Sequence, residues 1–341
     1  MSKSYHFVKM PLMIVIYLLG LPLSTLGQFS VVSTIPADGA TNVDTAITFQ
    51  ITFNAPLDTS ARFDYPSGFF LSAAIHPDTL VGEPDSITLS PDLKTVYVHN
   101  PHLWPDTRYL LLIANAVSST GDSLSIPYLV TFTTGSSLPT ATVSGTVSYP
   151  GTDVTGTAVI LFNAPLFAEE EVEADHATIV QTSAGNYTIN YVSPGTYWPV
   201  AVKDFIITAD GGLEPKVGGG LGFYDMDTNG VPDSIVISEG QQMSGIDISL
   251  FSLTPVTARH NYPTVADSAQ NWASDAVLVQ LGTPDISPAG EAMIWMYAFY
   301  SPTVAAYRAW VSMGTLVMPM ELEEPPEATT ALPANWLDSD V

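Results

Sequence analysis

The chain has 341 residues, 46% of them hydrophobic, and it carries 9 basic against 34 acidic residues, a net charge of −25. The length suits two or three domains, and the apolar content argues against intrinsic disorder. The acidic balance argues against nucleic acid and anionic membrane surfaces as partners, and it suits divalent cations. Cysteine is absent, so no disulfide holds the fold, which fits a bacterial cell surface better than a small eukaryotic secreted domain.

The N-terminus, residues 1–27, has the pattern of a secretory signal peptide. Lys3 and Lys9 precede an apolar run at 10–23, and small residues follow before an expected cut ahead of Gln28. The alternative is a membrane anchor, but the run of about 14 residues is shorter than the roughly 20 that a spanning helix needs. We therefore expect a secreted or cell-surface bacterial protein with no transmembrane segment after cleavage.

Short alternating runs separated by turn residues predict a first domain at 28–137. The expected strands cover residues 29–32, 46–53, 86–89, 95–98, 109–114 and 128–133. Pro-Ala-Asp-Gly at 36–39 and Gly-Asp at 121–122 are typical turn sequences. Six or seven strands in about 105 residues, without helical periodicity, predict a β-sandwich.

Four stretches of this domain resemble the bacterial Ig-like domains of the S-layer (SbsA-type) family. They are VSTIPADGATNV at 32–43, ITFQITFNAPLD at 47–58, LWPDTRY at 103–109 and YLVTFTTG at 128–135. The resemblance implies a structural or spacer Ig-like fold without catalysis.

His99 and His102 are three residues apart, but Pro101 between them argues against a helix that would align them for a metal. We interpret them as turn residues.

A second β-sandwich is predicted at 138–254, with strands at 142–149 and 157–162 and with turns that lead into strands at 184–189 and 194–202. The order of VSGTV at 143–147, GNYTI at 185–189 and PGTYWPVAV at 194–202 resembles the carboxypeptidase regulatory-like, prealbumin-type sandwich. That resemblance implies an accessory module. A His-x-x-Glu pair is missing, so no peptidase is expected; Glu173 and His176 are interpreted as exposed polar residues, and the acidic run at 169–175 as a solvated loop.

The one strong cluster of candidate ligands is DMDTNGVPD at 225–233. Asp225, Asp227, Asn229 and Asp233 occupy positions 1, 3, 5 and 9 of a calcium loop, with Gly230 at position 6 for the sharp turn. Position 12 is Val236 rather than a bidentate glutamate, so we expect weak calcium binding in a strand-to-strand loop. The alternative is an Asp/Asn/Gly turn without an ion.

Asp204 and Asp210 precede this loop, and either could add a ligand to it. The sequence does not place them.

The last segment, 255–341, changes pattern and predicts a small α+β unit. Val265, Ala269, Trp272 and Ala276 recur at helical spacing, with Thr264 as the expected cap and Asp267 in the first turn. Strands are expected at 291–300 and 305–317, broken at Ser-Pro 301–302. The run GEAMIWMYAFYS at 290–301 resembles PepSY-like domains of surface proteins. The chain is expected to stop inside this unit. Four tryptophans of the unit are interpreted as core residues rather than a ligand platform: Trp272, Trp295, Trp310 and Trp336.

Catalytic signatures are missing from the sequence: it has no cysteine nucleophile, no His-Glu-x-x-His, no Gly-x-Ser-x-Gly and no phosphate loop. The mainly β organisation indicates a non-catalytic surface protein acting as a spacer, display or adhesion scaffold. Its expected partner is a cell-envelope or extracellular protein or glycan. The alternative is an accessory carbohydrate- or peptide-binding part of a larger secreted hydrolase, which a catalytic domain encoded downstream of Val341 would favour.

The signal peptide gives a direct prediction. Exported protein should begin at Gln28, because signal peptidase cuts after the small residues of the c-region. Intact mass spectrometry of secreted material checks this; a mass that includes Met1 would indicate an anchor instead.

Overall fold

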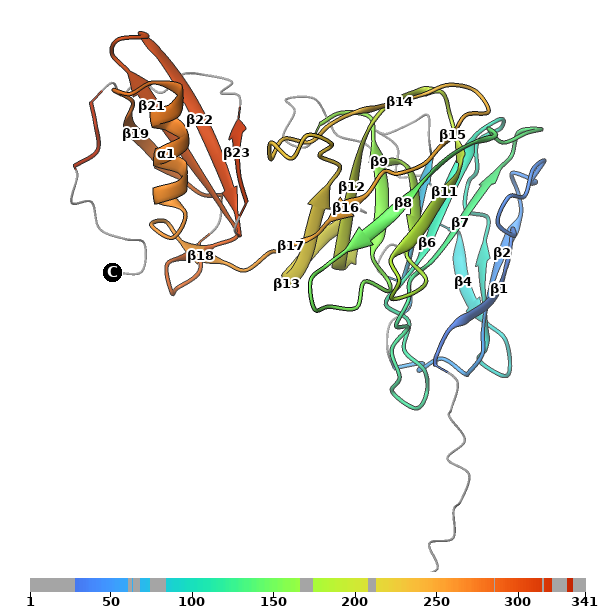
Figure 1. Cartoon of the computed structure of the whole chain (residues 1–341). Coiled ribbons are helices and arrows are strands. Elements are labelled where there is room, and N and C mark those ends of the chain that lie inside the picture. The colour runs from blue at the N-terminus through green and yellow to red at the C-terminus, as the bar shows by residue number, and fades with distance from the viewer. Residues whose placement is uncertain are drawn as a thin grey trace, which may run out of the picture.

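The computed structural model is mainly β, with several antiparallel sheets and one short helix (Figure 1). It describes residues 28–60, 63, 68–73, 84–165, 174–207, 213–284, 286–314, 316–320 and 330–333. The predicted signal peptide lies outside these residues, as do Glu173, Asp210 and Trp336. Among the described residues, no helix combines the length and the apolar character needed to cross a bilayer.

The first unit is the predicted β-sandwich. One antiparallel sheet has the order β1-β2-β5-β4 and the other β3-β6-β7. Their strands are β1 (Val31–Ile35), β2 (Thr48–Phe53), β3 (Phe69–Ala73), β4 (Ser86–Leu89), β5 (Thr95–His99), β6 (Arg108–Ile113) and β7 (Tyr128–Thr133). The core between the sheets contains Phe49, Ile51, Tyr109, Leu111 and Phe132, all fully buried. Sequence reasoning missed β3, because a short apolar run without alternation has no periodicity to identify it.

The second unit is also a sandwich. Its larger sheet has the order β10-β9-β12-β13-β17, with β14 added to β12, and its smaller sheet has β8 between β11 and the short parallel strands β15 and β16. The strands are β8 (Ala141–Ser148), β9 (Ala158–Phe162), β10 (Ala174–Ile179), β11 (Asn186–Val192), β12 (Gly195–Ile207), β13 (Leu213–Phe223), β14 (Ile235–Ile237), β15 (Gln242–Met243), β16 (Ile248–Ser249) and β17 (Phe251–Ser252).

The glycine run at 218–222 lies inside β13, a strand that the sequence did not predict. A Cβ on Gly219 would lie 2.6 Å from the carbonyl oxygen of Lys203, and one on Gly222 would lie 2.5 Å from that of Ser249. Real Cβ atoms are not found at such distances, so β13 can approach β12 and β16 this closely only without side chains. Glycine thus serves sheet packing here.

The third unit packs one helix on a sheet, in agreement with the predicted α+β pattern. Its elements are β18 (Val256–Thr257), α1 (Tyr262–Trp272), β19 (Val277–Gly282), β20 (Glu291–Ala292), β21 (Ile294–Ser301), β22 (Ala306–Met313) and β23 (Leu316–Met320). Antiparallel strands in the order β19-β21-β22-β23 form the sheet. Val265 and Ala269 of α1 are buried against Trp295, Tyr297 and Trp310.

The helix begins earlier than its pattern indicated. Asn261, not Thr264, is the N-cap, Asp267 lies beyond the first turn, and α1 ends before Ala276. Pro263 explains the earlier start, because a proline without an N–H suits the first turn, where that donor has no helical partner. The amide of Asn261 donates instead to the carbonyl oxygen of Gly314, at 2.5 Å.

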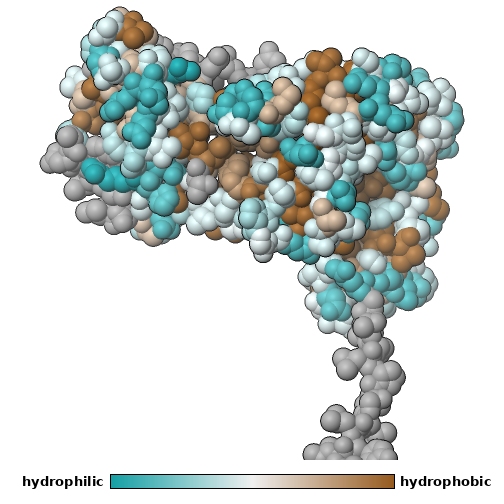
Figure 2. All heavy atoms as spheres, in the orientation of Figure 1, coloured by the Kyte–Doolittle hydropathy of each residue, from teal (hydrophilic) through white to brown (hydrophobic). Residues whose placement is uncertain are grey.

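A shared apolar layer joins the three units, and the second sandwich lies between the other two (Figure 1). The first unit contributes Leu112 and Ala114, and the third contributes Val311, Met313 and Met318. The second unit supplies the largest part from its larger sheet, namely Ala158, Ile160, Val200, Val202, Phe205, Leu221, Phe223 and the nearby Leu253. Apolar residues also gather at the surface where the third unit meets the second sandwich (Figure 2).

A polar network crosses the junction of the first two units. Arg108 of β6, with 9% of its surface exposed, places Nη1 2.9 Å from both ring nitrogens of His176 and 3.0 Å from Oγ of Ser193. Its Nη2 donates to the carbonyl oxygen of Asp175 at 2.8 Å and lies 3.8 Å from the Asp175 carboxylate. Burial, with the positive charge of Arg108 beside it, lowers the pKa of His176 to about 2. The imidazole is therefore neutral at pH 7 and can accept a hydrogen bond.

These positions correct the sequence interpretation of the acidic stretch. His176 is 1% exposed and Asp175 is half-buried, because β10 forms the edge of the larger sheet against the first unit. Neither was expected to be buried.

We predict that Arg108→Ala lowers the free energy of unfolding by about 3 kcal/mol, because it leaves buried acceptors without a donor. Urea unfolding followed by circular dichroism measures the loss. Arg308→Ala is the control, since Arg308 is exposed and its guanidinium carbon lies 5.7 Å from the centroid of the Trp310 ring; its cost should be about 0.5 kcal/mol. Equal losses in the two variants would contradict the role assigned to Arg108.

Candidate metal site

The candidate ligands lie in the loop between β13 and β14, where the sequence predicted a strand-to-strand connection. One carboxylate oxygen from each of Asp225, Asp227 and Asp233 lies within 4.8 Å of the other two. Asp225 and Asp233 are half-buried and Asp227 is exposed. Three of the four predicted ligands are therefore brought together, and the cluster could bind a metal ion.

Backbone hydrogen bonds hold these carboxylates in place. Asp225 Oδ1 accepts from the N–H of Asn229 at 3.1 Å, and its Oδ2 accepts from the N–H of Gly230 at 2.8 Å. Across the loop, Asp233 Oδ2 accepts from the N–H of Met226 at 2.7 Å, while its own N–H donates to the carbonyl oxygen of Tyr224 at 2.8 Å. The first and last acidic residues thus close the loop on itself.

Asn229, the fourth predicted ligand, is turned toward its neighbours. Its Oδ1 accepts from the N–H of Val231 at 2.7 Å, and its Nδ2 donates to Asp227 Oδ2 at 3.0 Å. The amide therefore stabilises the turn and neutralises none of the negative charge.

Gly230 has the conformation predicted for position 6. Its φ of +82° lies in the left-handed region that favours glycine, and Thr228 also has a positive φ, of +57°. A Cβ on Gly230 would lie 3.7 Å from the carbonyl oxygen of Val317 in β23. The loop of the second unit consequently faces the sheet of the third unit.

The same hydrogen bonds would hold a plain Asp/Asn turn, so they do not by themselves require an ion. What distinguishes this loop is that three carboxylates converge in a chain of net charge −25. Like charges at such separations repel, and a divalent cation would convert that repulsion into attraction.

Asp204 does not join the cluster, although the sequence allowed it to. Its Oδ1 lies 3.3 Å from Nζ of Lys203, the residue before it in β12. Asp210 lies outside the described residues.

His99 and His102 of the first unit have separate partners. His99 in β5 contacts hydroxyls, with Nε2 2.9 Å from Oγ1 of Thr88, whereas Nε2 of His102 lies 2.9 Å from Oδ1 of Asp85. His102 lies in the connection after β5, whereas His99 is the last residue of that strand rather than a turn residue.

Three of the tryptophans are core residues. Trp295 and Trp310 are each 4% exposed, and Trp272 packs against Trp310 with ring centroids 6.2 Å apart. The indole N–H of Trp295 donates to the carbonyl oxygen of Val256 at 2.7 Å. A ligand platform of these rings is therefore not formed.

Residues 27–134 match the family model described as "Bacterial Ig-like domain". The first unit is thus a bacterial Ig-like domain, which agrees with the family resemblance of its sequence. The match covers about a third of the chain and leaves the second and third units without a family. No curated protein matches the chain.

Solved structures show only distant likeness. The N-terminal part of the bacterial S-layer protein SbsC has 16% identity and a TM-score of 0.24, over 62% of this chain and 44% of that one. Domains 1–6 of surface layer protein SbsC have 10% identity and a TM-score of 0.25, over 86% of this chain and 53% of that one. The matches span about half of each S-layer chain.

A third likeness is to the LD transpeptidase LdtMt1 in complex with imipenem, with 13% identity and a TM-score of 0.21 over 65% of this chain and 89% of that one. At such TM-scores neither the S-layer proteins nor the transpeptidase indicate what this chain does.

Proposed function

We propose that the chain is a secreted or cell-surface, non-catalytic protein of tandem Ig-like modules that acts as a spacer, display or adhesion scaffold. The observation that carries this proposal is the bacterial Ig-like domain at 27–134, joined to the next unit by a shared apolar layer and by buried Arg108. Modules coupled in this way keep a fixed orientation, which is what a spacer or display element requires.

We assign the domains as 28–137, 138–254 and 255–341 after a signal peptide at 1–27. The ends of the sheets fall close to these limits, since β7 ends at Thr133, β8 starts at Ala141 and β17 ends at Ser252. The sandwich of the second domain suits a carboxypeptidase regulatory-like module, and the helix on an antiparallel sheet in the third suits a PepSY-like one. The partner would be a cell-envelope or extracellular protein or glycan.

Three of the four described histidines support a non-catalytic role. His176 is buried and neutral in the Arg108 network, His99 contacts threonine hydroxyls, and His102 pairs with Asp85. Within the described part of the chain, none of these three histidines connects a serine or threonine hydroxyl to a carboxylate, as an acid–base relay would require. An acyl-transfer site would need such a relay.

We further propose that calcium is the metal of the Asp225–Asp233 loop, held by Asp225, Asp227, Asp233 and Asn229 after its amide turns inward. Oxygen-only ligands and a flexible strand-to-strand loop suit calcium better than magnesium, which demands a tighter octahedron. The missing bidentate glutamate places the affinity in the roughly 10⁻⁴–10⁻³ M class of extracellular modules.

Calcium at about ten times its Kd should stabilise the folded chain by roughly 1.4 kcal/mol, because it binds the native loop and not the unfolded chain. The melting temperature should rise in millimolar calcium and rise less in magnesium. Differential scanning calorimetry of the exported protein, with calcium and with chelator, measures this shift.

Asp225→Ala should abolish the calcium shift. The matched control is Asp153→Ala, because Asp153 Oδ1 accepts from the N–H of Thr155 at 2.9 Å in a similar turn and belongs to no carboxylate cluster among the described residues. Identical melting curves with calcium and with chelator would leave the loop as a plain turn.

The non-catalytic role predicts no turnover. Purified exported protein should release no product from bacterial cell-wall glycans or peptides above the rate of a heat-denatured sample, because His99, His102 and His176 assemble no acid–base relay with a nucleophile in the described part of the chain. Reducing-sugar and free-amine assays measure this. Sustained hydrolysis that survives further purification would refute the proposal.

A further inference from the structure

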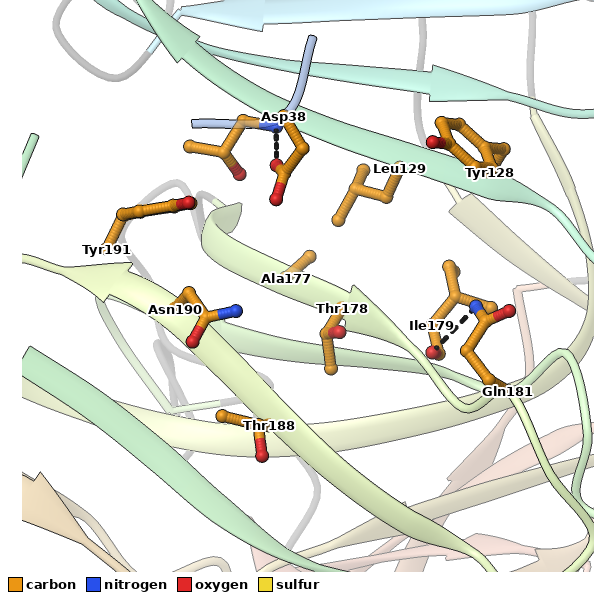
Figure 3. A pocket seen from close by; sticks show the side chains of 11 residues that line it. Asp38, Tyr128, Leu129, Ala177, Thr178, Ile179, Gln181, Thr188, Asn190 and Tyr191 are labelled. Atoms are coloured by element: carbon orange, nitrogen blue, oxygen red, sulfur yellow. Dashed lines mark hydrogen bonds between the residues drawn. The ribbon is translucent and has the colours of Figure 1, made fainter. Parts of the chain in front are cut away.

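A groove lies where the first sandwich meets the second. Its volume is about 220 Å³, and it is open to solvent. Figure 3 shows its walls: one comes from β7 and the loop after β1, and the other from β10 and β11. A strand of the first sandwich and two strands of the second therefore meet at this point.

Local backbone geometry builds one end of the groove. Asp38 Oδ1 accepts from the N–H of Thr131 at 2.8 Å, which fixes the loop after β1 against β7. Opposite, Tyr191 has a φ of +59° at the irregularity of β11 between Ile189 and Val192. A Cβ on Gly39 would collide with the Tyr191 hydroxyl, so glycine is what lets the phenol reach the first unit. Burial, and then the charge of Asp38, raise the pKa of Tyr191, which agrees with the two side chains facing each other.

The polar side chains of the groove are free to bind a ligand. Figure 3 draws hydrogen bonds only for Asp38 and for Gln181, whose amide donates to the carbonyl oxygen of Ile179 at 3.1 Å. Among the described residues, the side chains of Tyr128, Thr178, Thr188 and Asn190 make no hydrogen bond. Hydroxyl and amide groups of this kind both donate and accept.

The rest of the lining restricts the class of ligand. No lysine or arginine is among the described residues that line the groove, so phosphate, sulfate and carboxylate ligands lack a counter-charge from them. Asp38 is the single carboxylate among those same residues, too few for a divalent cation. Leu129, Ala177 and Ile179 provide an apolar floor, and Tyr128 and Tyr191 provide flat ring surfaces at either side (Figure 3).

We propose that this interdomain groove binds a neutral saccharide of one or two pyranose rings. Sugar hydroxyls both donate and accept, and they match the hydroxyl and amide groups of the walls. The C–H faces of a pyranose ring suit the phenol rings and the apolar floor. The free oxygen of Asp38 can accept from a sugar hydroxyl in a charge-assisted bond. The small volume favours a short ligand over an extended peptide.

This binding activity goes beyond the proposed scaffold role and does not depend on it. A scaffold without the groove site would still be a scaffold, and a glycan-binding groove could equally serve a chain that carries an enzyme elsewhere.

The test is methyl-detected NMR on the exported chain, in which the methyl groups of Leu129, Ala177 and Ile179 report on the groove floor. The probes are cellobiose, maltose, lactose and N,N′-diacetylchitobiose, with digalacturonate as the anionic control. A titration to about 20 mM detects a Kd of about 1 mM or tighter. We expect saturable shifts of these methyl groups with at least one neutral disaccharide and none with digalacturonate.

Asn190→Ala should weaken that binding about tenfold, through the loss of the amide hydrogen bonds. Asn186→Ala is the matched control, because Asn186 is an exposed asparagine on the same strand and the same face but outside the groove lining; it should leave the Kd unchanged. Thr188→Val removes one hydroxyl but keeps a β-branched side chain that favours the strand. This variant should weaken binding about fivefold.

A pull-down on insoluble cell-wall polysaccharide with the same variants tests whether the ligand is an envelope glycan rather than a free sugar. Binding in either arm that falls in Asn190→Ala supports the proposal. Three results would overturn it: no saturable binding to any neutral probe, binding of digalacturonate in preference, or equal effects of the Asn190 and Asn186 variants.

Discussion

The larger sheet of the second sandwich is buried on both faces, and the arrangement of the whole chain depends on this. In β9 the burial does not alternate: Val159 and Leu161 point into the second unit's own core, while Ala158 and Ile160 point into the layer shared with the other units. Apolar side chains on both faces cannot be satisfied by one partner sheet. The first and third units cover the second face, so both pack directly against the second sandwich.

The Arg108 network adds specificity to that apolar contact. An isolated buried guanidinium would be costly, but Arg108 finds acceptors on Asp175, His176 and Ser193 of the second unit. The arrangement works because burial keeps His176 neutral, with its pKa lowered to about 2. A protonated imidazole there would face the guanidinium as a second positive charge. These hydrogen bonds form in one relative placement of the two sandwiches, although Nε of Arg108 is buried without a partner among the described residues; apolar contact alone would not fix that placement.

Both candidate binding sites are found where units meet. The Asp225–Asp233 loop faces Val317 of the third unit, and the saccharide groove lies between β7 of the first unit and β10 and β11 of the second. Such junctions are concave and gather strand ends whose polar groups are not used inside a sheet. A scaffold of packed modules can therefore carry recognition sites without a dedicated binding domain, and a cation beside the third unit would also remove charge repulsion near that contact.

The sequence by itself determined the local features, because they depend on neighbouring residues. Alternation and turn residues predicted most strands of the first sandwich but fewer of the second, among them β8, β9, β11 and β12; helical spacing predicted α1, and the ligand spacing of Asp225, Asp227 and Asp233 predicted a cluster that the structure brings together. What only the tertiary structure decided were the contacts between remote segments. Arg108 and His176 are 68 residues apart, and Asp38 and Tyr191 belong to different sandwiches. Contacts between these residues depend on how two sheets pack, and sheet packing produces no periodic pattern in the sequence. For that reason His176 was expected to be exposed, and β10 and β13 were missed. The groove likewise had no signal in the sequence.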